Sequence, residues 1–398
     1  MDEDSRQEAE QSGMGTRCVH AGEIVDHVTG SIVTPVYQNA TFLYPYAIDS
    51  DGRYTDRKAP FYYTRLGNPT VRALERKVSS LEGTEDAVAF SSGMAAISTA
   101  VIESLGSGGH ILSVRDVYGG THSLLSEMLP RMGHEVTFFE RGRTQFLEEM
   151  LRENTRAVYV ETPTNPTLEV YDIREIFRFA HDHGLVSIMD NTFPSPVNLQ
   201  PASLGADVVV HSATKYLAGH SDVIAGVVAG RKEIVGRIRE TMTVLGGSME
   251  PFTAFLTERG MKTLDLRVRK INENAMAIAE YLEDHTRVSK VLYPGLESHE
   301  GHKVAKDIMK GYGGVLSFEV RGRMEEARRV IRRMRIAKVA ASLGGVESLV
   351  TIPAETSHSQ LSEAERSERG ISDTLIRFSV GIEDEEDLIM DIGQALEP

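Results

Sequence analysis

The segment VVVHSATKYLAGHSD, residues 208–222, leads from an apolar run directly to a lysine. The run begins with three valines, and such a β-branched run is typical of a buried strand. Lys215 follows it, and the hydroxyl groups of Ser212 and Thr214 stand just before the lysine. A lysine at the mouth of a hydrophobic core costs free energy unless it is paired or used. The segment therefore indicates a chemical use for this amine.

The chain around this segment alternates between strand and helix patterns. Short apolar runs such as DAVAF, HILSV and AVYVE each lead into a helical pattern, and the segments predicted to be helical include THSLLSEMLPRMG and FLEEMLREN. Strands that alternate with helices connect through right-handed crossovers, which predicts an α/β fold with a mostly parallel sheet covered by helices. The first helix of the series is predicted to begin at Pro69, with Asn68 as its N-cap and Gly83 as its stop.

The same patterns divide the chain into four parts. Residues 1–15 are acidic and polar and are predicted to be a disordered tail. The turn-rich residues 16–66 are predicted to be an N-terminal arm that reaches a neighbouring subunit. Residues 67–258 carry the alternating pattern and form the large domain. A long helical stretch and sparser strands then predict a smaller α+β domain at residues 259–398.

Composition and charge exclude several classes of protein. The 398 residues include 43 basic and 58 acidic side chains, and the formal charge of -15 argues against nucleic acid or an anionic membrane as the main partner. No stretch approaches ~20 apolar residues, so a membrane span is not expected. Cys18 is the one cysteine, which excludes an intrachain disulfide and fits a reducing compartment. Since the acidic N-terminus has no apolar leader, we expect a cytoplasmic protein.

Polar and aromatic side chains follow the predicted strands at one edge of the sheet. In open α/β sheets ligands bind beyond the carboxyl ends of the strands, so these side chains are expected to share a site. Taken singly, each has an ordinary explanation as a helix cap, a turn residue or core packing. Together they provide a phosphate cradle at a helix N-terminus, an aromatic plate, a carboxylate and an amine. The candidates are Gly93, Met94, Tyr118, Asn165, Asp190, Ser212, Thr214 and Lys215.

Pyridoxal phosphate is the cofactor that needs this set of groups. Its aldehyde condenses with a lysine amine, and its pyridine nitrogen needs a carboxylate in order to stay protonated. Its phosphate needs hydroxyl and backbone N–H groups, and an aromatic side chain can stack on its ring. The sequence therefore predicts pyridoxal 5'-phosphate bound through Lys215, and it predicts no metal site.

Six motifs are specific enough to be compared with known families. They are YTRLGNPT, ETPTNPTLEVYDI, DNTFPSP, SATKYLAGHSDVIAG, ASLGGVESL and RFSVGIED. They resemble the motifs of the Cys/Met-metabolism (trans-sulfuration) family of fold-type I pyridoxal-phosphate enzymes, in the family's order from about residue 16 to the C-terminus. The family includes cystathionine γ-synthase, cystathionine γ-lyase and methionine γ-lyase. The resemblance implies a pyridoxal-phosphate-dependent carbon–sulfur lyase or trans-sulfuration transferase.

The resemblance also implies a role for each candidate residue. Lys215 would form the covalent link to the cofactor and then move protons, and Asp190 would pair with the pyridine nitrogen. Asn165 would bond the phenolic oxygen of the cofactor. Tyr118 would stack on the ring and protonate the leaving group. The groups implied to hold the phosphate are Gly93, Met94, Ser212 and Thr214.

Four further residues gain a role from the resemblance alone. Tyr63 and Arg65 would reach across a dimer to the phosphate of the neighbouring subunit, which agrees with the arm predicted there. Arg377 would bind the substrate α-carboxylate through two hydrogen bonds, with Ser342 nearby. The resemblance implies a homotetramer built from two dimers with shared sites.

The implied reaction is γ-elimination or γ-replacement on sulfur amino acids and activated homoserine, which releases 2-oxobutyrate and ammonia or forms a thioether. Three departures from the family's patterns bear on the substrate. Ala341 stands where cystathionine enzymes usually have glutamate, and Ser123 stands where many cystathionine γ-lyases have arginine. Gly120 stands where methionine γ-lyases usually have cysteine. We predict a cystathionine γ-synthase/γ-lyase with broad substrate tolerance, with methionine γ-lyase as the alternative.

Other classes on the same fold are remote alternatives. An aminotransferase or a non-catalytic binding protein would share the sheet and the ring-stacking residue. A cysteine desulfurase needs a mobile catalytic cysteine, and Cys18 in the predicted arm is poorly placed for one. A binding protein without turnover has no reason to keep both Lys215 and Tyr118.

Overall fold

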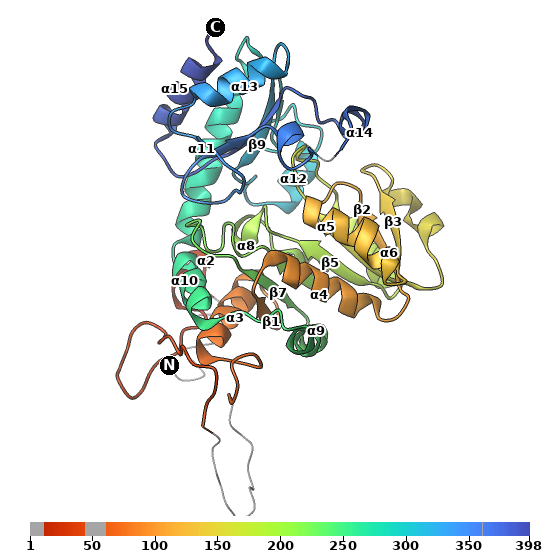
Figure 1. The fold of residues 1–398 in the computed structure, drawn as a ribbon, viewed down its shortest axis with the longest axis vertical. Coiled ribbons are helices and arrows are strands. Elements are labelled where there is room, and N and C mark those ends of the chain that lie inside the picture. The colour runs from red at the N-terminus through yellow and green to blue at the C-terminus, as the bar shows by residue number, and fades with distance from the viewer. Residues whose placement is uncertain (1–11, 44–60, 360) are drawn as a thin grey trace, which may run out of the picture.

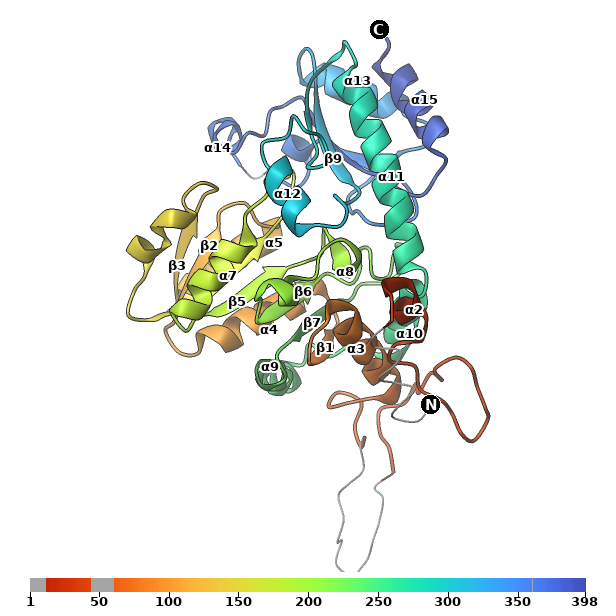
Figure 2. The ribbon, with the colours of Figure 1, turned by 180° about the vertical axis from the view of Figure 1, so that it is seen from behind.

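The described part of the chain, residues 12–43, 61–359 and 361–398 of a computed structural model, forms two β-sheets. A 7-stranded sheet lies in the lower part of Figure 1 and a 5-stranded sheet in the upper part. The 20-residue helix α11 (Leu264–Glu283) runs from beside the first sheet to the second, as Figures 1 and 2 show. In this part of the chain no helix combines the length and the apolar character that crossing a membrane needs.

The 7-stranded sheet, which we call the large sheet, is mostly parallel. Its strand order is β1-β7-β6-β5-β4-β2-β3, and the neighbouring pairs are parallel except those that include β7. The α/β prediction is therefore confirmed. The strands are β1 (Asp86–Phe90), β2 (His110–Val114), β3 (Glu135–Phe139), β4 (Thr155–Glu161), β5 (Val186–Asp190), β6 (Val208–His211) and β7 (Gly226–Gly230).

Helices cover both faces of the large sheet. Helices α4 (Gly93–Leu105) and α9 (Lys232–Leu245) lie on one face, and α3 (Pro69–Glu82) and α7 (Ile173–Asp182) lie on the other (Figures 1 and 2). The central strands are buried from end to end, which explains why they read in the sequence as continuous apolar runs without alternation.

Helix α3 forms where the capping residues predict it. The Asn68 side chain accepts a hydrogen bond of 2.9 Å from the N–H of Thr70, and Pro69 occupies the first helical position. Gly83 ends the helix with φ of 69°, a left-handed conformation that glycine adopts without steric cost. The predicted start and stop of this helix are both confirmed.

The second sheet has its own hydrophobic core, in which Phe318, Ile376 and Phe378 are fully buried. Its strand order is β10-β11-β12-β9-β8. The strands are β8 (Val288–Leu292), β9 (Val315–Val320), β10 (Lys338–Val339), β11 (Leu349–Thr351) and β12 (Leu375–Ser379). The core is closed by α11 and by α13 (Met324–Arg333) and α15 (Glu385–Leu396).

Two helical segments differ from the sequence prediction. The segment THSLLSEMLPRMG forms α5 (Gly119–Ser123), the π-helical turn η1 (Leu124–Met128) and α6 (Leu129–Arg131), because Pro130 has no N–H to donate and interrupts the regular ladder. The segment FLEEMLREN forms the 3-10 helix η2 (Thr144–Met150), in which Leu147 is the buried residue. So little apolar surface does not support a longer helix.

The remaining helices are short connectors, apart from α10. Helix α10 contains residues 258 and 259, between which the sequence places the boundary of the two domains. These helices are α8 (Ser195–Asn198), η3 (Pro201–Leu204), α10 (Pro251–Met261), α12 (His302–Ile308), η4 (Pro353–Glu355) and α14 (Glu363–Glu368).

In its described residues, 16–43 and 61–66, the predicted N-terminal arm consists of part of helix α2 (Met14–His20) and otherwise mostly irregular chain. Helix α2 packs against α3 and α11, and Cys18 is fully buried there as a free thiol. The buried Lys77 Nζ donates a hydrogen bond of 2.8 Å to the Cys18 carbonyl, which fixes α2 to α3. Of the predicted tail, residues 1–15, the first eleven residues lie outside the described part of the chain.

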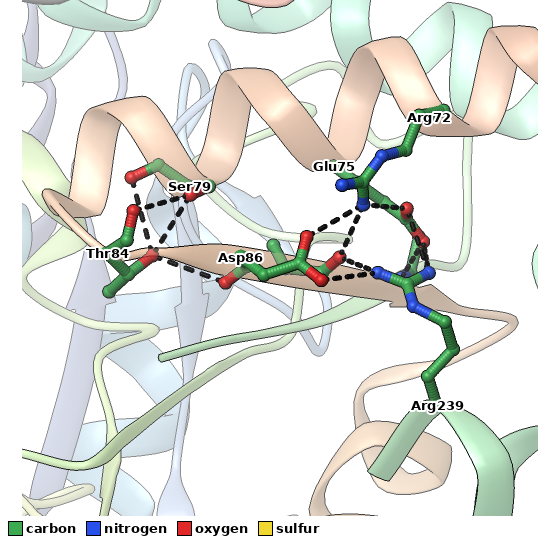
Figure 3. Close-up of polar contacts among 8 residues, drawn as sticks. Arg72, Glu75, Ser79, Thr84, Asp86 and Arg239 are labelled. Carbon is green, nitrogen blue, oxygen red and sulfur yellow. Dashed lines mark hydrogen bonds and ion pairs between the residues drawn. The ribbon is translucent and has the colours of Figure 1, made fainter. Parts of the chain in front are cut away.

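A network of ion pairs around the buried Glu75 joins the helices of the two faces across the edge strand β1 (Figure 3). Arg239 of α9 donates to Glu75 Oε1 of α3 at 2.8 Å and to Asp86 Oδ2 of β1 at 3.2 Å. Arg72 of α3 binds the other oxygens of Glu75 and Asp86 at 2.9 and 2.7 Å. Glu75 also accepts the N–H of Ala89 at 3.0 Å. The network thus fixes the edge of the large sheet between α3 and α9.

The substitution Arg239→Met should destabilise the protein by about 3 kcal/mol, because it leaves the buried Glu75 carboxylate with fewer counter-charges. The measurement is urea unfolding followed by circular dichroism, since the chain contains no tryptophan. Arg237→Met is the matched control: Arg237 lies on the same helix, is about half exposed and pairs with the exposed Glu233. The control should cost less than about 1 kcal/mol. Equal losses in the two variants would contradict the proposed importance of the network.

Candidate active site

The candidate site lies where the carboxyl ends of the large sheet meet the second sheet. Lys215 follows β6, and its Nζ donates a hydrogen bond of 2.7 Å to Oγ of Ser342, in the loop before β11. Burial lowers the pKa of Lys215, and the positive charge of Arg377 lowers it further. Ser342 has φ of 114°, in the region that favours glycine, which is the kind of backbone strain found at functional sites.

Arg377 provides a buried anion site beside this amine. It belongs to β12 and is 7% exposed, and its Nη2 donates to the Ser342 carbonyl at 2.9 Å. Its Nη1 donates to Oδ1 of Asn165 at 3.2 Å, and Asn165 follows β4. The Nε atom is buried and has no hydrogen-bond partner among the described residues. A guanidinium group with a free buried N–H and no neighbouring carboxylate suits a carboxylate ligand.

Asp190 ends β5 beside these groups. Its Oδ1 accepts the N–H of Thr192 at 2.9 Å, and its Oδ2 accepts the hydroxyl of Tyr159 at 3.3 Å. Burial raises the pKa of Asp190 above its ordinary value, while the bonds from Thr192 and the nearby His211 oppose that rise. A cationic ligand group at this carboxylate would relieve the cost of its burial.

The N-terminus of α4 forms a cradle for an anion. Ser92 caps the helix, and a Cβ atom at Gly93 would lie 2.8 Å from Cβ of Ser212, so no larger residue fits there. The N–H groups of the first turn, including that of Met94, are free of intrahelical partners in any helix. The hydroxyl of Thr214 bonds the N–H of Ala225 at 2.9 Å, which fixes the strand-end loop beside the cradle. This arrangement fits a phosphate.

Tyr118 lies at the N-terminus of α5, and its side chain is 50% exposed. Its backbone N–H donates to Oε2 of Glu161 at 2.7 Å. A Cβ atom at Gly120 would lie 2.7 Å from Cε1 of Tyr118 and 2.9 Å from Sδ of Met94. Gly120 therefore leaves the space into which the Tyr118 ring and the Met94 side chain pack.

Tyr63 and Arg65 are not brought to this site. Both are exposed, and the Arg65 guanidinium lies 5.6 Å from the centre of the Tyr63 ring. Arg65 Nη1 donates to the carbonyl of Thr243 on α9. Within the described residues, no hydrogen bond or ion pair joins either side chain to another candidate site residue. Their placement agrees with a role outside the site of their own chain.

Three residues of the site region were not identified from the sequence. Tyr159 and Glu161 lie in strand β4, just before the motif TPTNP. They are two residues apart, and side chains two residues apart in a strand project to the same face of the sheet. Arg267 of α11 is 4% exposed and donates hydrogen bonds of 2.9 Å to the carbonyls of Tyr216 and Gly260. It holds the turn that follows Lys215, but in the sequence it looks like any arginine of a solvated helix. In the described residues no group of His, Cys, Asp and Glu side chains could hold a metal ion.

Comparison with known proteins gives one consistent result. Residues 15–397 match the family model described as "Cys/Met metabolism PLP-dependent enzyme". The chain is 41% identical over 395 residues to the L-methionine gamma-lyase of Fusobacterium nucleatum subsp. nucleatum, covering 98% of this chain and 99% of that protein. It is 44% identical over 383 residues to the cystathionine gamma-lyase of Bacillus subtilis, covering 96% and 98%. The crystal structure of cystathionine gamma-lyase from Lactobacillus plantarum complexed with L-serine superposes with a TM-score of 0.90 at 37% identity, covering 96% and 98%.

The lowered pKa of Lys215 predicts that its amine reacts at a lower pH than the exposed lysines of the same protein. The full-length protein without cofactor is acylated at a series of pH values, and the labelled peptides are quantified by mass spectrometry. Arg377→Met removes the second cause of the shift, so the midpoint for Lys215 should rise towards that of an ordinary lysine. An unchanged midpoint in this variant would show that Arg377 does not influence the amine.

Proposed function

Because this chain belongs to the Cys/Met metabolism PLP-dependent enzyme family, we propose that it catalyses γ-elimination and γ-replacement on sulfur amino acids and activated homoserine with broad tolerance for the leaving group. Elimination releases 2-oxobutyrate and ammonia, and replacement forms a thioether. The observation that carries the proposal is the line of contacts from Lys215 through Ser342 to Arg377, which sets an amine beside a site for a carboxylate.

The residues at the strand ends fit pyridoxal phosphate. The phosphate would bind at the capped N-terminus of α4, beside Ser212. Gly93 suits this position because the structure leaves no room there for a Cβ atom. Asp190 suits the pyridine nitrogen, and the exposed ring of Tyr118 suits the face of the cofactor. When bound, this cofactor supplies an electron sink for the charge that develops on the substrate. Asn165 would hold the phenolic oxygen, and Met94 and Thr214 would complete the phosphate site.

Lys215 and Arg377 would act together on the substrate. Arg377 would bind the α-carboxylate through Nε and an Nη group, which fixes the substrate Cα near Nζ of Lys215. Burial and the charge of Arg377 lower the pKa of Lys215, which favours the neutral amine that Nζ needs in order to take the Cα proton. The hydroxyl of Ser342 would orient the amine, since it already accepts a hydrogen bond from Nζ.

Tyr118 would donate a proton to the departing group. Its ring belongs to the start of α5, and Tyr118 is 50% exposed. A sulfur leaving group departs more easily when it is protonated as its bond to carbon breaks, and a positioned phenol can supply that proton. The pair Tyr118 and Lys215 would therefore divide the proton transfers between the leaving group and Cα.

The assembly is also a proposal. The arm, residues 16–66, exposes Val28 at 93%, Ile32 at 89% and Leu43 at 92%, and such apolar exposure suits a surface that another subunit covers. Tyr63 and Arg65 would then reach the phosphate of the neighbouring subunit in a homotetramer of two dimers. The large domain at 67–258 would hold the cofactor and the domain at 259–398 the substrate carboxylate. A cytoplasmic location stays a prediction.

Methionine γ-lyase is the second candidate function. Ala341 and Ser123 are both exposed and uncharged, so they offer no charge to the distal amino-acid group of cystathionine. The tight space at Gly120 favours the cystathionine type, because a cysteine there would contact Tyr118 and Met94. The two observations together support an enzyme that accepts both kinds of substrate.

A side-by-side assay of 2-oxobutyrate release from cystathionine, homocysteine and methionine tests this function. We expect turnover of all three, with kcat/KM values within about a hundredfold of one another. Sodium borohydride should fix the cofactor to Lys215, and Lys215→Ala should lose both the label and the turnover. A preference beyond about a thousandfold would show that another group reads the distal end of the substrate.

The variant Ala341→Glu, assayed in the same way, should shift selectivity towards cystathionine by about 1–3 kcal/mol. Ala340→Glu is the matched control, because Ala340 is the preceding residue and is equally exposed. The same gain in both variants would point to a general effect of added charge.

Mixing of two inactive variants tests the shared site. A mixed dimer of Arg65→Ala and Lys215→Ala subunits contains one site in which both residues are intact, if Arg65 acts in the neighbouring subunit. Random pairing should then restore about a quarter of the wild-type activity. Lys215→Ala mixed with the Arg65→Ala, Lys215→Ala double variant is the control and should stay inactive. Absence of recovery in verified mixed dimers would place Arg65 in the site of its own chain.

A further inference from the structure

Two buried carboxyl groups end neighbouring strands of the large sheet. Glu161 ends β4 and Asp190 ends β5, and the two residues are direct partners in the parallel register. They are 4% and 5% exposed. The hydroxyl of Tyr159 donates to Asp190 Oδ2 at 3.3 Å, and Tyr159 projects to the same face of β4 as Glu161. Both carboxyl groups therefore face the same side of the sheet.

The pair lacks a counter-ion. Neither carboxyl group forms an ion pair with a Lys, Arg or His side chain in the part of the chain that the structure describes. Two like charges at this depth cannot both ionise without a large cost in free energy, so one of the two groups holds a proton. In related geometries two carboxyl groups share one proton for the same reason.

The surroundings assign that proton to Glu161. Burial raises the pKa of Glu161 well above its usual range, and the charge of Asp190 raises it further. The pKa of Asp190 is also raised by burial, but hydrogen bonds from Thr192 and the charge of His211 lower it. Asp190 thus keeps the negative charge of the pair.

The other charged groups around Glu161 favour the same assignment. Asp116, in the loop after β2, raises the pKa of Glu161, as a second nearby carboxylate must. Arg369 lies 3.8 Å from Asp116 and offsets part of that charge. His211, at the end of β6, pairs through Nε2 with the buried Glu82 at 2.5 Å rather than with Glu161. No cation is thus available to hold Glu161 ionised among the described residues.

Glu161 also touches the backbone of a proposed catalytic residue. Its Oε2 accepts the N–H of Tyr118 at 2.7 Å, the first backbone group of the turn that begins α5. This helix start has no side-chain cap of its own. The carboxyl oxygen therefore fixes the point from which the Tyr118 ring projects.

We propose that Glu161 is a positioning residue that works in its neutral form, holding the Tyr118 backbone in place while it leaves Asp190 as the charged member of the carboxyl pair. The proposal rests on the function proposed above, because it concerns the proton donor and the cofactor carboxylate of that site. A neutral carboxyl group keeps an acceptor oxygen for Tyr118 without adding a second negative charge beside Asp190.

Two substitutions separate the acceptor from the charge. Glu161→Gln keeps the size, the acceptor oxygen and the neutral state, so the cofactor's visible circular dichroism and kcat should stay within about threefold of the wild type. Glu161→Ala removes the acceptor and should lower kcat about 10- to 100-fold with little change in KM, because the Tyr118 ring loses its position. Its visible circular dichroism band should also change.

The pH dependence of stability gives a readout that needs no cofactor. A group whose pKa is raised in the folded protein contributes stability at low pH, and that stability is lost as the pH rises through the raised pKa. The full-length wild type without cofactor should therefore lose thermal stability, relative to Glu161→Gln, as the pH rises above the ordinary pKa of glutamate towards the raised pKa, because the variant has no proton to lose. Glu169→Gln is the matched control, since Glu169 lies nearby with a raised pKa but does not contact Tyr118. It should not remove the loss attributed to Glu161.

The outcomes separate this proposal from the proposed function. An equal loss of kcat in Glu161→Gln and Glu161→Ala would show that the ionised form is needed and would overturn the proposal. An unchanged kcat and spectrum in Glu161→Ala would exclude a positioning role. The same loss of stability with rising pH in the wild type and Glu161→Gln would place the proton elsewhere. If the wild type itself bound no pyridoxal phosphate, the proposed function would fail, while the stability comparison would still test the protonation of Glu161.

Discussion

Ionisable groups that are wholly or partly buried at the carboxyl edge of the large sheet, without an ion-pair partner among the described residues, are the constraint on which the rest of the site depends. Lys215 and Arg377 form no ion pair within the described residues, and neither does the pair of Glu161 and Asp190. Hydrogen bonds to Ser342 hold the two cations in place, but they do not neutralise them. Such burial costs free energy that a ligand of matching charge recovers. Binding of an anionic cofactor and a carboxylate substrate is therefore coupled to the stability of the fold.

The second sheet is essential to that arrangement because it provides Arg377, and Ser342 lies in the loop before its strand β11. Arg377 comes from β12, while Lys215 follows β6 of the large sheet, so their distance depends on how the two sheets are fixed together. Arg267 contributes to this: it lies in α11, the helix that runs from one sheet to the other, and binds the carbonyls of Tyr216 and Gly260. A Cβ atom at Gly219 would lie 2.0 Å from its guanidinium, so the turn after Lys215 closes tightly around this buried charge.

The sequence predicts best those features that depend on local pattern. The cap at Asn68, the apolar strands and the polar residues at their carboxyl ends follow from periodicity and from the rule that places ligands at that edge. Strand β10, with two residues, is too short to leave a periodic signal. The roles of Glu161 and Arg267 depend on burial, which a single sequence does not reveal for a charged residue at a strand end or in a helix. Arg65 could be linked to the site only through the family resemblance, because its own chain leaves it exposed.

The residues assigned to the two ends of the substrate differ in burial. This difference explains how one fold can be combined with a preference for different leaving groups. The α-carboxylate end is assigned to Arg377, which is 7% exposed and held by Ser342 and Asn165, so a change there would leave buried polar groups unpaired. Ser123 and Ala341, assigned to the distal end, are exposed, and substitutions at exposed positions cost little stability. Selection can therefore alter the preference for a leaving group without disturbing the buried groups to which the chemistry is assigned. The shared reaction and the variable substrate follow from the same distribution of burial.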